Sequence, residues 1–435
     1  MNNFGFSFKN NPFNTLVYEI RSLIDEQNGP VLSRILSIEK FHLNNEILFN
    51  LNSTDQWENF VSKTLDSPWD DVVRCHFLVI HSLAVNANNY IKAFEHQCSM
   101  IQALVKVLAQ SKEESWMLPV VYIGSIELRK LAIRSDWQTS SNESYSNSGI
   151  FTKKEANKPD AHIEEAASQL MNLFRICAND SRTSIEQSKR QGMINIINQL
   201  FKIYFRINKL NLYKPLVRAL ENANIMEHFG LGQRVTYSYF TGMKSLYDSD
   251  YRKADHLLNF AFENCHPKHR KNLRIILLFL IPVKMLFAGF MPTKALLDEF
   301  QLLQFESLCE AIKQGNLYSF DRAIEKHSDF FYYYGIYFTL EKLKALVYRN
   351  IFKKVAKIVN SHQISLTYFV DAINYYRSDR NRIELIDDER VSCEEVHCLL
   401  ANLIAENKLK GYISLQHQKL VISKQNPFPK LSSVS

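Results

Sequence analysis

Glycine and proline are scarce in this sequence. Its 435 residues include 12 glycines and 11 prolines, together about 5%, whereas soluble proteins average roughly 12%. Because tight turns depend on these two residue types, the shortage argues against a β-sandwich, barrel or propeller, each of which needs many such turns. It also leaves few glycines for a loop that cradles phosphates. We therefore expect helices joined by short turns.

The motifs of nucleotide and metal enzymes are missing as well. The sequence has no Gly-x-x-x-x-Gly-Lys-Ser/Thr loop, no Gly-x-Gly-x-x-Gly fingerprint, no His-Glu-x-x-His and no Cys-x-x-Cys. Gly230-Leu-Gly232 is too isolated to count as a phosphate loop. His266-x-x-His269 lies in a basic run without acidic or thiol partners, which favours a solvated turn over a metal site. We predict a protein that is not an enzyme and that uses no cofactor and no metal.

Long apolar runs and targeting signals are also lacking. The most membrane-like stretch, Ile275 to Phe290, is interrupted by Pro282 and Lys284 and is shorter than the roughly 20 residues that a bilayer needs. We expect a buried pair of helices there, without membrane insertion. Residues 1–8 lack a basic region followed by an apolar stretch, so no secretory signal is expected. The seven cysteines form no framework of close pairs, which favours reduced, intracellular thiols.

The remaining composition is that of an ordinary globular protein. Apolar residues make up 46% and charged residues 22% of the chain, so a packed core is expected. Apolar residues recur at helical spacing along most of the length. We predict an N-terminal helical region (1–65), helical repeats (66–300) and a C-terminal part (301–435). Residues 135–160 are rich in serine and have no period, which predicts a flexible loop.

One predicted helix pair, within residues 233–265, has the small-residue spacing of a tetratricopeptide (TPR) repeat. The residues that carry the spacing are Gly242, Ala254, Leu258 and Ala261. Small side chains at such positions let two antiparallel helices approach closely. We therefore predict a stack of helical hairpins with degenerate repeats, which is a TPR-like solenoid.

The only convincing β-pattern lies near the end of the chain. Two β-rich runs, Tyr412–Leu415 and Leu420–Ser423, flank the polar turn Gln416–Lys419. The turn lacks the Asn-Gly signal of a two-residue hairpin, so a four-residue connection is expected. A capping box formed by Ser392 and Glu395 opens the preceding helix. Three helices followed by a hairpin make a winged helix, predicted over about residues 340–425, and this unit serves both DNA docking and protein association.

Positive charge is concentrated in three tracts, although the net charge is a mild +7. Residues 189–218 hold seven basic side chains and residues 264–297 hold six, with no acidic one in either tract; residues 400–435 hold five lysines and Glu406. An ordinary solvated face is the alternative explanation for each tract. Lysines on a mobile wing suit phosphate contacts, which bind without reading sequence and weaken with salt. The predicted nucleic-acid-binding residues are Lys408, Lys410, His417, Lys419 and Lys424 at the wing, with Arg349, Lys353 and Lys354 on the long helix before it.

Several short sequence strings, in a fixed order over roughly residues 70–435, together make a specific pattern, although none of them is a catalytic motif. The strongest runs from Gly411 through His417 to Pro429. The others are Glu114–Val120, Asn179–Arg182 with Ile185-Glu186, Asn198–Phe205, Gln233–Tyr237, Pro282–Leu286 and Met291–Thr293. Together with the helical stack and the winged helix, this set resembles the PCI domain family, and within it the branch found in the TREX-two mRNA export complex.

The resemblance implies an all-α, TPR-like solenoid that ends in a winged helix with a small β-hairpin. It implies a non-catalytic scaffold subunit that couples transcription to nuclear mRNA export and binds RNA, with DNA as a further candidate, without sequence specificity. The implied partners are a GANP-type PCI scaffold protein, a small acidic disordered subunit shared with the proteasome lid, and nuclear pore components. The implied location is the nucleus, including the nuclear envelope and pore, and a cytoplasmic pool is left open. The alternative is a PCI scaffold in a proteasome-lid-like or signalosome-like assembly that does not bind nucleic acid.

The small acidic partner is expected to lie along the first two basic tracts. The predicted partner-binding residues are Lys202, Arg206, Lys209, Lys214, Lys268, Arg270, Lys271 and Arg274. The chain departs from the family pattern in a longer serine-rich loop and in the charged stretch from Arg377 to Arg390, which looks like an insertion between two winged-helix helices. A DNA-reading helix-turn-helix has a turn of about 3–4 residues, so the insertion argues against base reading by the following helix, which also carries Glu394 and Glu395.

Overall fold

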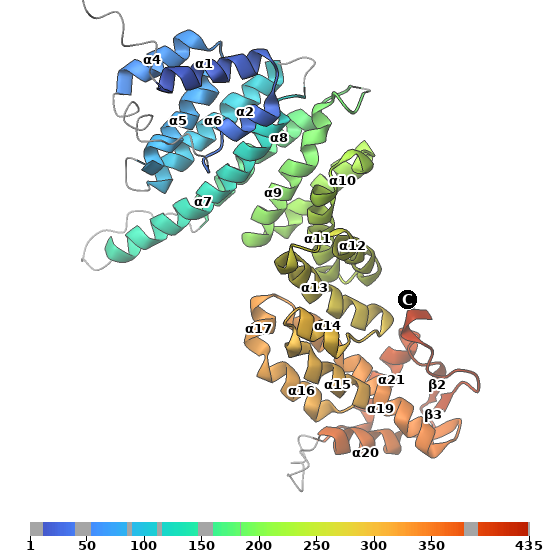
Figure 1. Cartoon of the computed structure of the whole chain (residues 1–435). Coiled ribbons are helices and arrows are strands. Elements are labelled where there is room, and N and C mark those ends of the chain that lie inside the picture. Colours follow the sequence, from blue (N-terminus) through green and yellow to red (C-terminus); the bar gives the residue numbers. More distant parts are fainter. Residues whose placement is uncertain are drawn as a thin grey trace, which may run out of the picture. The chain divides into compact units, whose positions relative to one another are not determined.

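The chain divides into two compact units, unit 1 (residues 1–237) and unit 2 (residues 238–435), shown in Figure 1. The structure is a computed structural model, and it describes residues 12–39, 54–84, 89–110, 115–146, 160–182, 184–377 and 390–433. The predicted domain boundaries at residues 66 and 301 stay predictions.

Unit 1 is built from helices. They are α1 (Pro12–Asp25), α2 (Gly29–Ile35), α4 (Thr54–Thr64), α5 (Trp69–Ala84), α6 (Tyr90–Gln110), α7 (Leu118–Ser146), α8 (Ala161–Ala178), η1 (Lys189–Gly192), α9 (Met193–Arg206), η2 (Leu210–Leu212), α10 (Tyr213–Ala223), η3 (Met226–His228) and the first residues of α11 (Leu231–Tyr247). Successive helices from α5 to α9 pack against one another, as in a helical-hairpin solenoid. In α9, Ile196, Leu200 and Ile203 are fully buried at helical spacing, and each such side chain contributes roughly 2 kcal/mol on burial.

Two expectations for unit 1 need correction. The predicted loop at residues 135–160 is wrong for its first part, because α7 continues as a helix to Ser146. Its serines at 135 and 140 do not end the helix. The hydroxyl of Ser140 donates to the carbonyl of Asp136 one turn back. Residues 147–159 lie outside the described residues. The apolar spacing of residues 185–208 also predicts a single helix, but the structure has η1 followed by the shorter α9 there.

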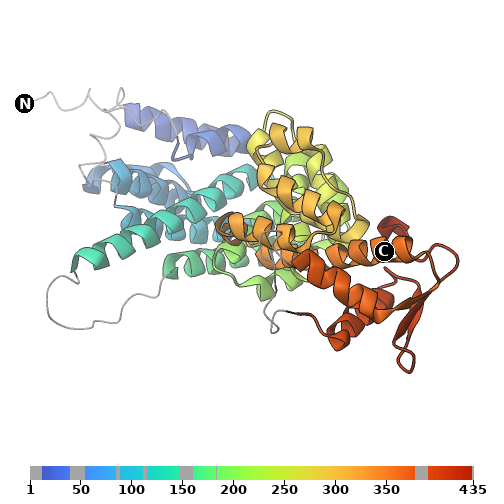
Figure 2. The ribbon, with the colours of Figure 1, turned by 90° about the horizontal axis from the view of Figure 1, so that it is seen from below.

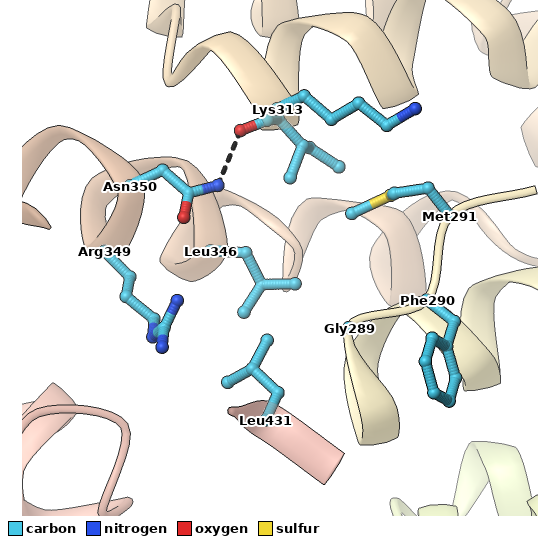
Figure 3. A pocket seen from close by; sticks show the side chains of 9 residues that line it. Gly289, Phe290, Met291, Lys313, Leu346, Arg349, Asn350 and Leu431 are labelled. Carbon is cyan, nitrogen blue, oxygen red and sulfur yellow. Dashed lines mark hydrogen bonds between the residues drawn. The ribbon is translucent and has the colours of Figure 1, made fainter. Parts of the chain in front are cut away.

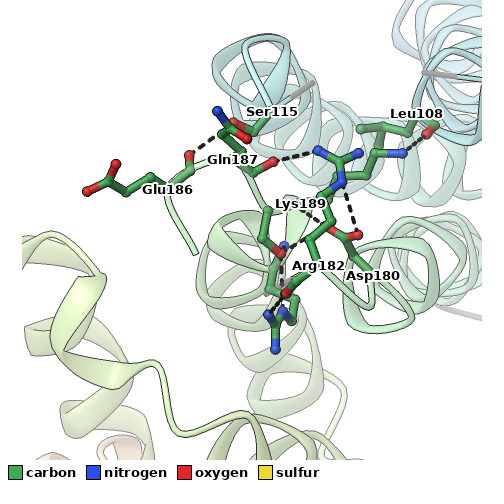
Figure 4. Close-up of polar contacts among 9 residues, drawn as sticks. Leu108, Ser115, Asp180, Arg182, Glu186, Gln187 and Lys189 are labelled. Carbon is green, nitrogen blue, oxygen red and sulfur yellow. Dashed lines mark hydrogen bonds and ion pairs between the residues drawn. The ribbon is translucent and has the colours of Figure 1, made fainter. Parts of the chain in front are cut away.

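The connection between α8 and η1 is held by polar contacts (Figure 4). Asp180 Oδ2 accepts hydrogen bonds from the Ser188 hydroxyl at 2.8 Å and from the Lys189 backbone N–H at 2.7 Å. Arg182 Nη1 donates to the Gln187 carbonyl at 2.7 Å. The buried Lys189 ammonium donates to the Leu108 carbonyl at the end of α6. The family-like string Asn179–Arg182 therefore has a structural role, since it fixes this connection on the solenoid.

A buried carboxyl group joins α7 to the segment that follows α2. Glu127 Oε1 accepts from the Ile38 backbone N–H at 2.8 Å and from the Ser37 hydroxyl at 3.1 Å, while its Oε2 has no partner among the described residues. Burial raises the pKa of Glu127 to about 7, although these two hydrogen bonds act in the opposite direction. The charge of Glu39 raises the pKa further and that of Lys130 lowers it.

We expect Glu127 to make unit 1 less stable as the pH rises from about 5 to about 7.5. The folded pKa lies above that of the unfolded chain, so the folded state binds the extra proton, and the free energy of unfolding falls as that proton is lost. Glu127→Gln should remove this decrease in the free energy of unfolding, which is on the order of 2 kcal/mol between pH 5 and pH 7.5. Urea unfolding of both proteins at pH 5 to 8 measures this difference. If the free energy of unfolding depended on pH in the same way in both proteins, Glu127 would not be the group responsible.

Unit 2 begins with α-helical hairpins and ends in a small sheet. Its elements after α11 are α12 (Tyr251–Asn264), α13 (Arg270–Ala288), α14 (Lys294–Glu299), η4 (Leu303–Phe305), α15 (Glu306–Gln314), α16 (Leu317–Lys326), α17 (Ser328–Tyr333), α18 (Tyr337–Glu341), α19 (Lys344–Val359), β1 (Gln363–Ser365), α20 (Leu366–Arg377), α21 (Cys393–Ala405), β2 (Gly411–Ser414), β3 (Lys419–Ile422) and η6 (Leu431–Ser433). The apolar stretch from Ile275 lies in α13, which is one helix with Pro282 inside it rather than the predicted pair. Among the described residues, no helix is both long and apolar enough to cross a membrane.

The small-residue hairpin predicted in residues 233–265 is present as α11 and α12. Ala254, Leu258 and Ala261 are fully buried on α12. A Cβ placed on Gly242 would lie only 2.7 Å from Leu258 Cγ. The absence of a side chain at Gly242 therefore lets α11 and α12 approach, as the TPR-like pattern predicts.

The C-terminal elements α19, β1, α20, α21, β2 and β3 form a winged helix, and the β2–β3 hairpin extends from the helices of unit 2 (Figure 2). The sheet has the order β1-β3-β2, and both pairs are antiparallel. The predicted four-residue connection is confirmed, although β2 and β3 each begin one residue earlier than expected. The capping box of Ser392 and Glu395 is confirmed at the start of α21. The predicted solenoid with a winged helix at its end is therefore the observed fold class.

Candidate nucleic-acid interface

The hairpin β2–β3, which we call the wing, has one buried and one exposed face. Leu420 and Ile422 of β3 are buried, so alternation along the strand turns Lys419 and Val421 to the other side. Val421 is paired with Tyr412 of β2, and directly paired residues lie on the same side of a sheet. We call this side the outer face of the wing.

The outer face and the residues that flank the wing carry unpaired positive charge, and the outer face also carries an aromatic ring. Lys419 is exposed, and Lys410 continues the pairing just before β2, since its carbonyl accepts from the Ser423 N–H at 2.9 Å. Lys424 is exposed next to Ser423. None of these three lysines forms an ion pair with a residue that the structure describes. His417 is exposed in the connection between the strands.

Tyr412 lies among these lysines and was not included in the sequence-based prediction. Its side chain is 63% exposed, although a tyrosine in a strand is ordinarily half-buried. An exposed aromatic ring among cations can stack on an unpaired base. The alternation of side chains along a strand could have identified it, because Tyr412 lies two residues after Lys410 and therefore on the same face.

Lys408 fits the prediction less well than the other wing lysines. Its side chain is only 17% exposed, and its ammonium pairs with Glu406 at 2.7 Å. Much of its charge is therefore neutralised within the protein.

Arg349 does not lie on an open basic surface, and the prediction that it contacts nucleic acid needs correction. It is 6% exposed, and burial lowers its pKa. Its Nε donates to the Lys408 carbonyl at 3.1 Å, and its Nη2 donates to the Pro429 carbonyl. Its guanidinium also lies 5.8 Å from the centroid of the Phe428 ring. These contacts attach both ends of the wing to α19.

Figure 3 shows Arg349 beside a pocket of about 400 Å³ that Leu346 and Leu431 also line. The neighbouring Asn350 donates through Nδ2 to the Ile312 carbonyl at 2.7 Å, which joins α19 to α15. The polar groups on this part of α19 therefore hold elements together.

The two lysines further along α19 are half-buried. The Lys354 ammonium donates to the Gln314 carbonyl and lies 5.3 Å from the centroid of the Tyr376 ring. The pKa of Lys353 is lowered by burial and then by the charges of Arg349 and Lys357. The predicted interface therefore narrows to the wing. The charged stretch 378–389, predicted to be an insertion, lies outside the described residues.

The predicted partner-binding residues lie partly in unit 1 and partly in unit 2. In unit 1, Lys209 pairs with Glu164 at 2.8 Å, whereas Arg206 and Lys214 are exposed. Lys202 is half-buried, and burial lowers its pKa. In unit 2, Lys268 and Lys271 are exposed.

The two arginines of the second tract contact α14 and the residues after it. Arg270 pairs with Glu299 at 3.1 Å, and Arg274 donates through Nε to the Phe300 carbonyl at 3.1 Å. The cations left for an acidic partner are therefore chiefly Arg206 and Lys214 in unit 1, with Lys268 and Lys271 in unit 2.

The chain is similar to known proteins along almost its whole length. A model of the PCI domain matches residues 324–424. PCI domain-containing protein 2 of Xenopus laevis is 40% identical over 421 residues, covering 97% of this chain and 98% of that protein. The PCI domain-containing protein 2 homolog of Drosophila melanogaster is 42% identical, covering 93% and 95%. A protein named Protein CSN12 homolog, from Neurospora crassa, is 28% identical over 87% of each chain. None of these names denotes an enzyme.

Proposed function

The chain belongs to the PCI domain-containing protein 2 family, and from this premise we propose that it is a non-catalytic scaffold subunit of a nuclear mRNA export complex of the TREX-two type. In this role it couples transcription to export. Its wing binds RNA, and also DNA, without reading the base sequence.

The observation that carries this proposal is the exposed positive charge on the wing and on the residues that flank it. Lys410, Lys419 and Lys424 are exposed and make no ion pair with any described residue. Lysines contact phosphates irrespective of sequence, and the exposed ring of Tyr412 can stack on any base. The acidic first turn of α21, with Glu394 and Glu395, repels phosphates and disfavours base reading by that helix.

The proposed partners are a GANP-type PCI scaffold protein, a small acidic disordered subunit and nuclear pore components, and the proposed location is the nucleus. Exposed, unpaired cations support the acidic partner. Lys214 in unit 1 and Lys268 and Lys271 in unit 2 are available to carboxylates.

Changing Lys410, Lys419 and Lys424 together to glutamate should weaken binding to all single-stranded RNA sequences alike, by tenfold or more. Each lost phosphate contact lowers the slope of log K against log salt by about 0.7 for a single strand, so the slope should fall by about 2. Fluorescence anisotropy of the purified complex at several salt concentrations measures both quantities.

The matched control carries the same charge change on exposed lysines outside the wing, namely Lys63, Lys92 and Lys326 to glutamate. Its slope should stay within about 0.5 of that of the unchanged protein. Equal losses in the two triple variants would reduce the effect to net charge and overturn the wing assignment. A stable complex that lacks the GANP-type scaffold and does not bind RNA would instead support the proteasome-lid-like or signalosome-like alternative.

A further inference from the structure

A polar pocket of about 360 Å³ lies in unit 1, between α9 and the first turn of α11. Its wall includes Asn198, Gln199 and Lys202 from α9 and Gly230 and Gly232 from the start of α11. The wing lies in unit 2, so the pocket is separate from the interface described above.

One cation, Lys202, stands in the wall of this pocket without a carboxylate beside it in the wall, and a second, Arg129, donates to the wall residue Gln199. The pKa of Lys202 is lowered by burial and then by the charge of Arg129, and that of Arg129 is lowered by burial and then by the charge of Arg206. Neither Lys202 nor Arg129 forms an ion pair within the described part of the chain. Lys209 shows the contrast, because it has Glu164 as a partner. Like charges held together in a half-buried place destabilise the protein unless an anion joins them.

Two buried amide side chains in the wall have hydrogen-bonding capacity left over. Gln199, 2% exposed, accepts from Arg129 Nε at 2.8 Å through Oε1, and its Nε2 donates to no described residue. Asn198, 4% exposed, donates through Nδ2 to the Gln233 carbonyl at 3.0 Å, so its Oδ1 is the acceptor and has no partner. An unsatisfied buried polar group costs about 1–3 kcal/mol, and a ligand in the pocket would supply the missing bonds.

The first turn of α11 adds backbone donors. The N–H groups of Gln233 and Arg234 bond back to the Gly230 carbonyl at 3.0 and 3.1 Å, whereas those of Leu231 and Gly232 have no acceptor within the described residues. The N-terminus of a helix carries partial positive charge and favours oxyanions. A Cβ at Gly232 would meet nothing within 4 Å, so the approach to these donors is open.

We propose that this pocket binds the phosphate monoester of a small, hydroxyl-bearing molecule. Lys202 Nζ, Gln199 Nε2 and the first N–H groups of α11 donate to the phosphate oxygens, and Asn198 Oδ1 accepts from a hydroxyl group. A monoester carries a charge of about −1.5 to −2 at neutral pH. It therefore matches Lys202, the neighbouring Arg129 and the positive end of α11 better than a carboxylate or a nucleic-acid diester, which carries one negative charge.

Calorimetric titration at constant ionic strength tests the proposal with the full-length chain. The probes are glycerol 3-phosphate, inorganic phosphate, acetate and an RNA oligonucleotide without a terminal phosphate. We expect glycerol 3-phosphate to bind most tightly of the small anions. Lys202→Gln should weaken its binding at least tenfold, and Arg218→Gln, at an exposed basic residue of the same tract outside the pocket wall, should leave it unchanged.

Lys202→Gln should also leave the melting midpoint without ligand unchanged or higher, because it relieves the repulsion by Arg129. Equal binding of acetate and glycerol 3-phosphate would overturn the proposal. So would Lys202-dependent binding of the RNA in preference to the monoester, or the absence of any heat of binding for glycerol 3-phosphate. Because the wing is untouched in these variants, the acetate result and the absence of heat leave the proposed function unaffected, whereas Lys202-dependent RNA binding would count against the wing as well.

Discussion

Arg349→Met should lower the free energy of unfolding of unit 2 by about 3 kcal/mol and detach the wing. Methionine fills similar space with an apolar side chain, but it cannot donate to the carbonyls of Lys408 and Pro429. These two residues lie before and after the wing in the sequence. Leaving buried carbonyls unsatisfied costs about 1–3 kcal/mol each. Urea unfolding monitored by far-ultraviolet circular dichroism measures the loss of stability. Hydrogen exchange of residues 410–423 measures the detachment of the wing.

Arg349→Lys distinguishes this structural role from a direct phosphate contact. Lysine keeps the charge but cannot reach two carbonyls with a planar fork, so we expect most of the destabilisation to persist. Any loss of RNA binding should then follow the loss of wing protection rather than the charge. Two results together would instead support a direct phosphate contact by Arg349. They are normal RNA binding by the lysine variant, and a methionine variant that is fully stable but does not bind RNA.

The wing could be predicted from sequence because its signals are local. Alternation in Leu420–Ser423 and the capping box at Ser392 each depend on residues within a few positions of one another. Strand β1 was missed because Gln363–Ser365 is three residues long and is stabilised by pairing with β3, more than 50 residues away. No period can be read from three residues.

The sites were harder to predict because charge in a sequence does not reveal burial. Arg349 was grouped with Lys353 and Lys354 as a basic surface. Its spacing from the buried Leu346 and Phe352 places it on the apolar stripe of α19 instead, and that signal was available. Its acceptor at Pro429, 80 residues later, could not be found from sequence. The pocket at Lys202 was hidden for the same reason, since Gly230-Leu-Gly232 is an isolated string until the fold places it beside α9.

Gly242→Val should destabilise unit 2 by about 3 kcal/mol, against the usual trend for helices. Replacing a glycine inside a helix normally gains up to about 1 kcal/mol. Here a Cβ would lie 2.7 Å from Leu258 Cγ and 3.3 Å from the Leu258 backbone N. The side chain can move, but the backbone contact forces α11 and α12 apart, and such overpacking costs about 1–3 kcal/mol or more. Chemical denaturation measures the change.

Leu258→Ala provides the second half of a double-mutant cycle. Alone it should cost about 2–5 kcal/mol through the cavity that it leaves, yet combined with Gly242→Val it should cost at least 1 kcal/mol less than the sum of the two. The valine then fills space that the leucine vacated, which is the coupling expected of residues in contact. Strict additivity would mean that α11 and α12 do not meet at Gly242, and the tetratricopeptide-like spacing would lose its physical basis. Coupling would show that Gly242 is needed because the backbones of α11 and α12 meet there, which is the physical basis of the tetratricopeptide-like spacing.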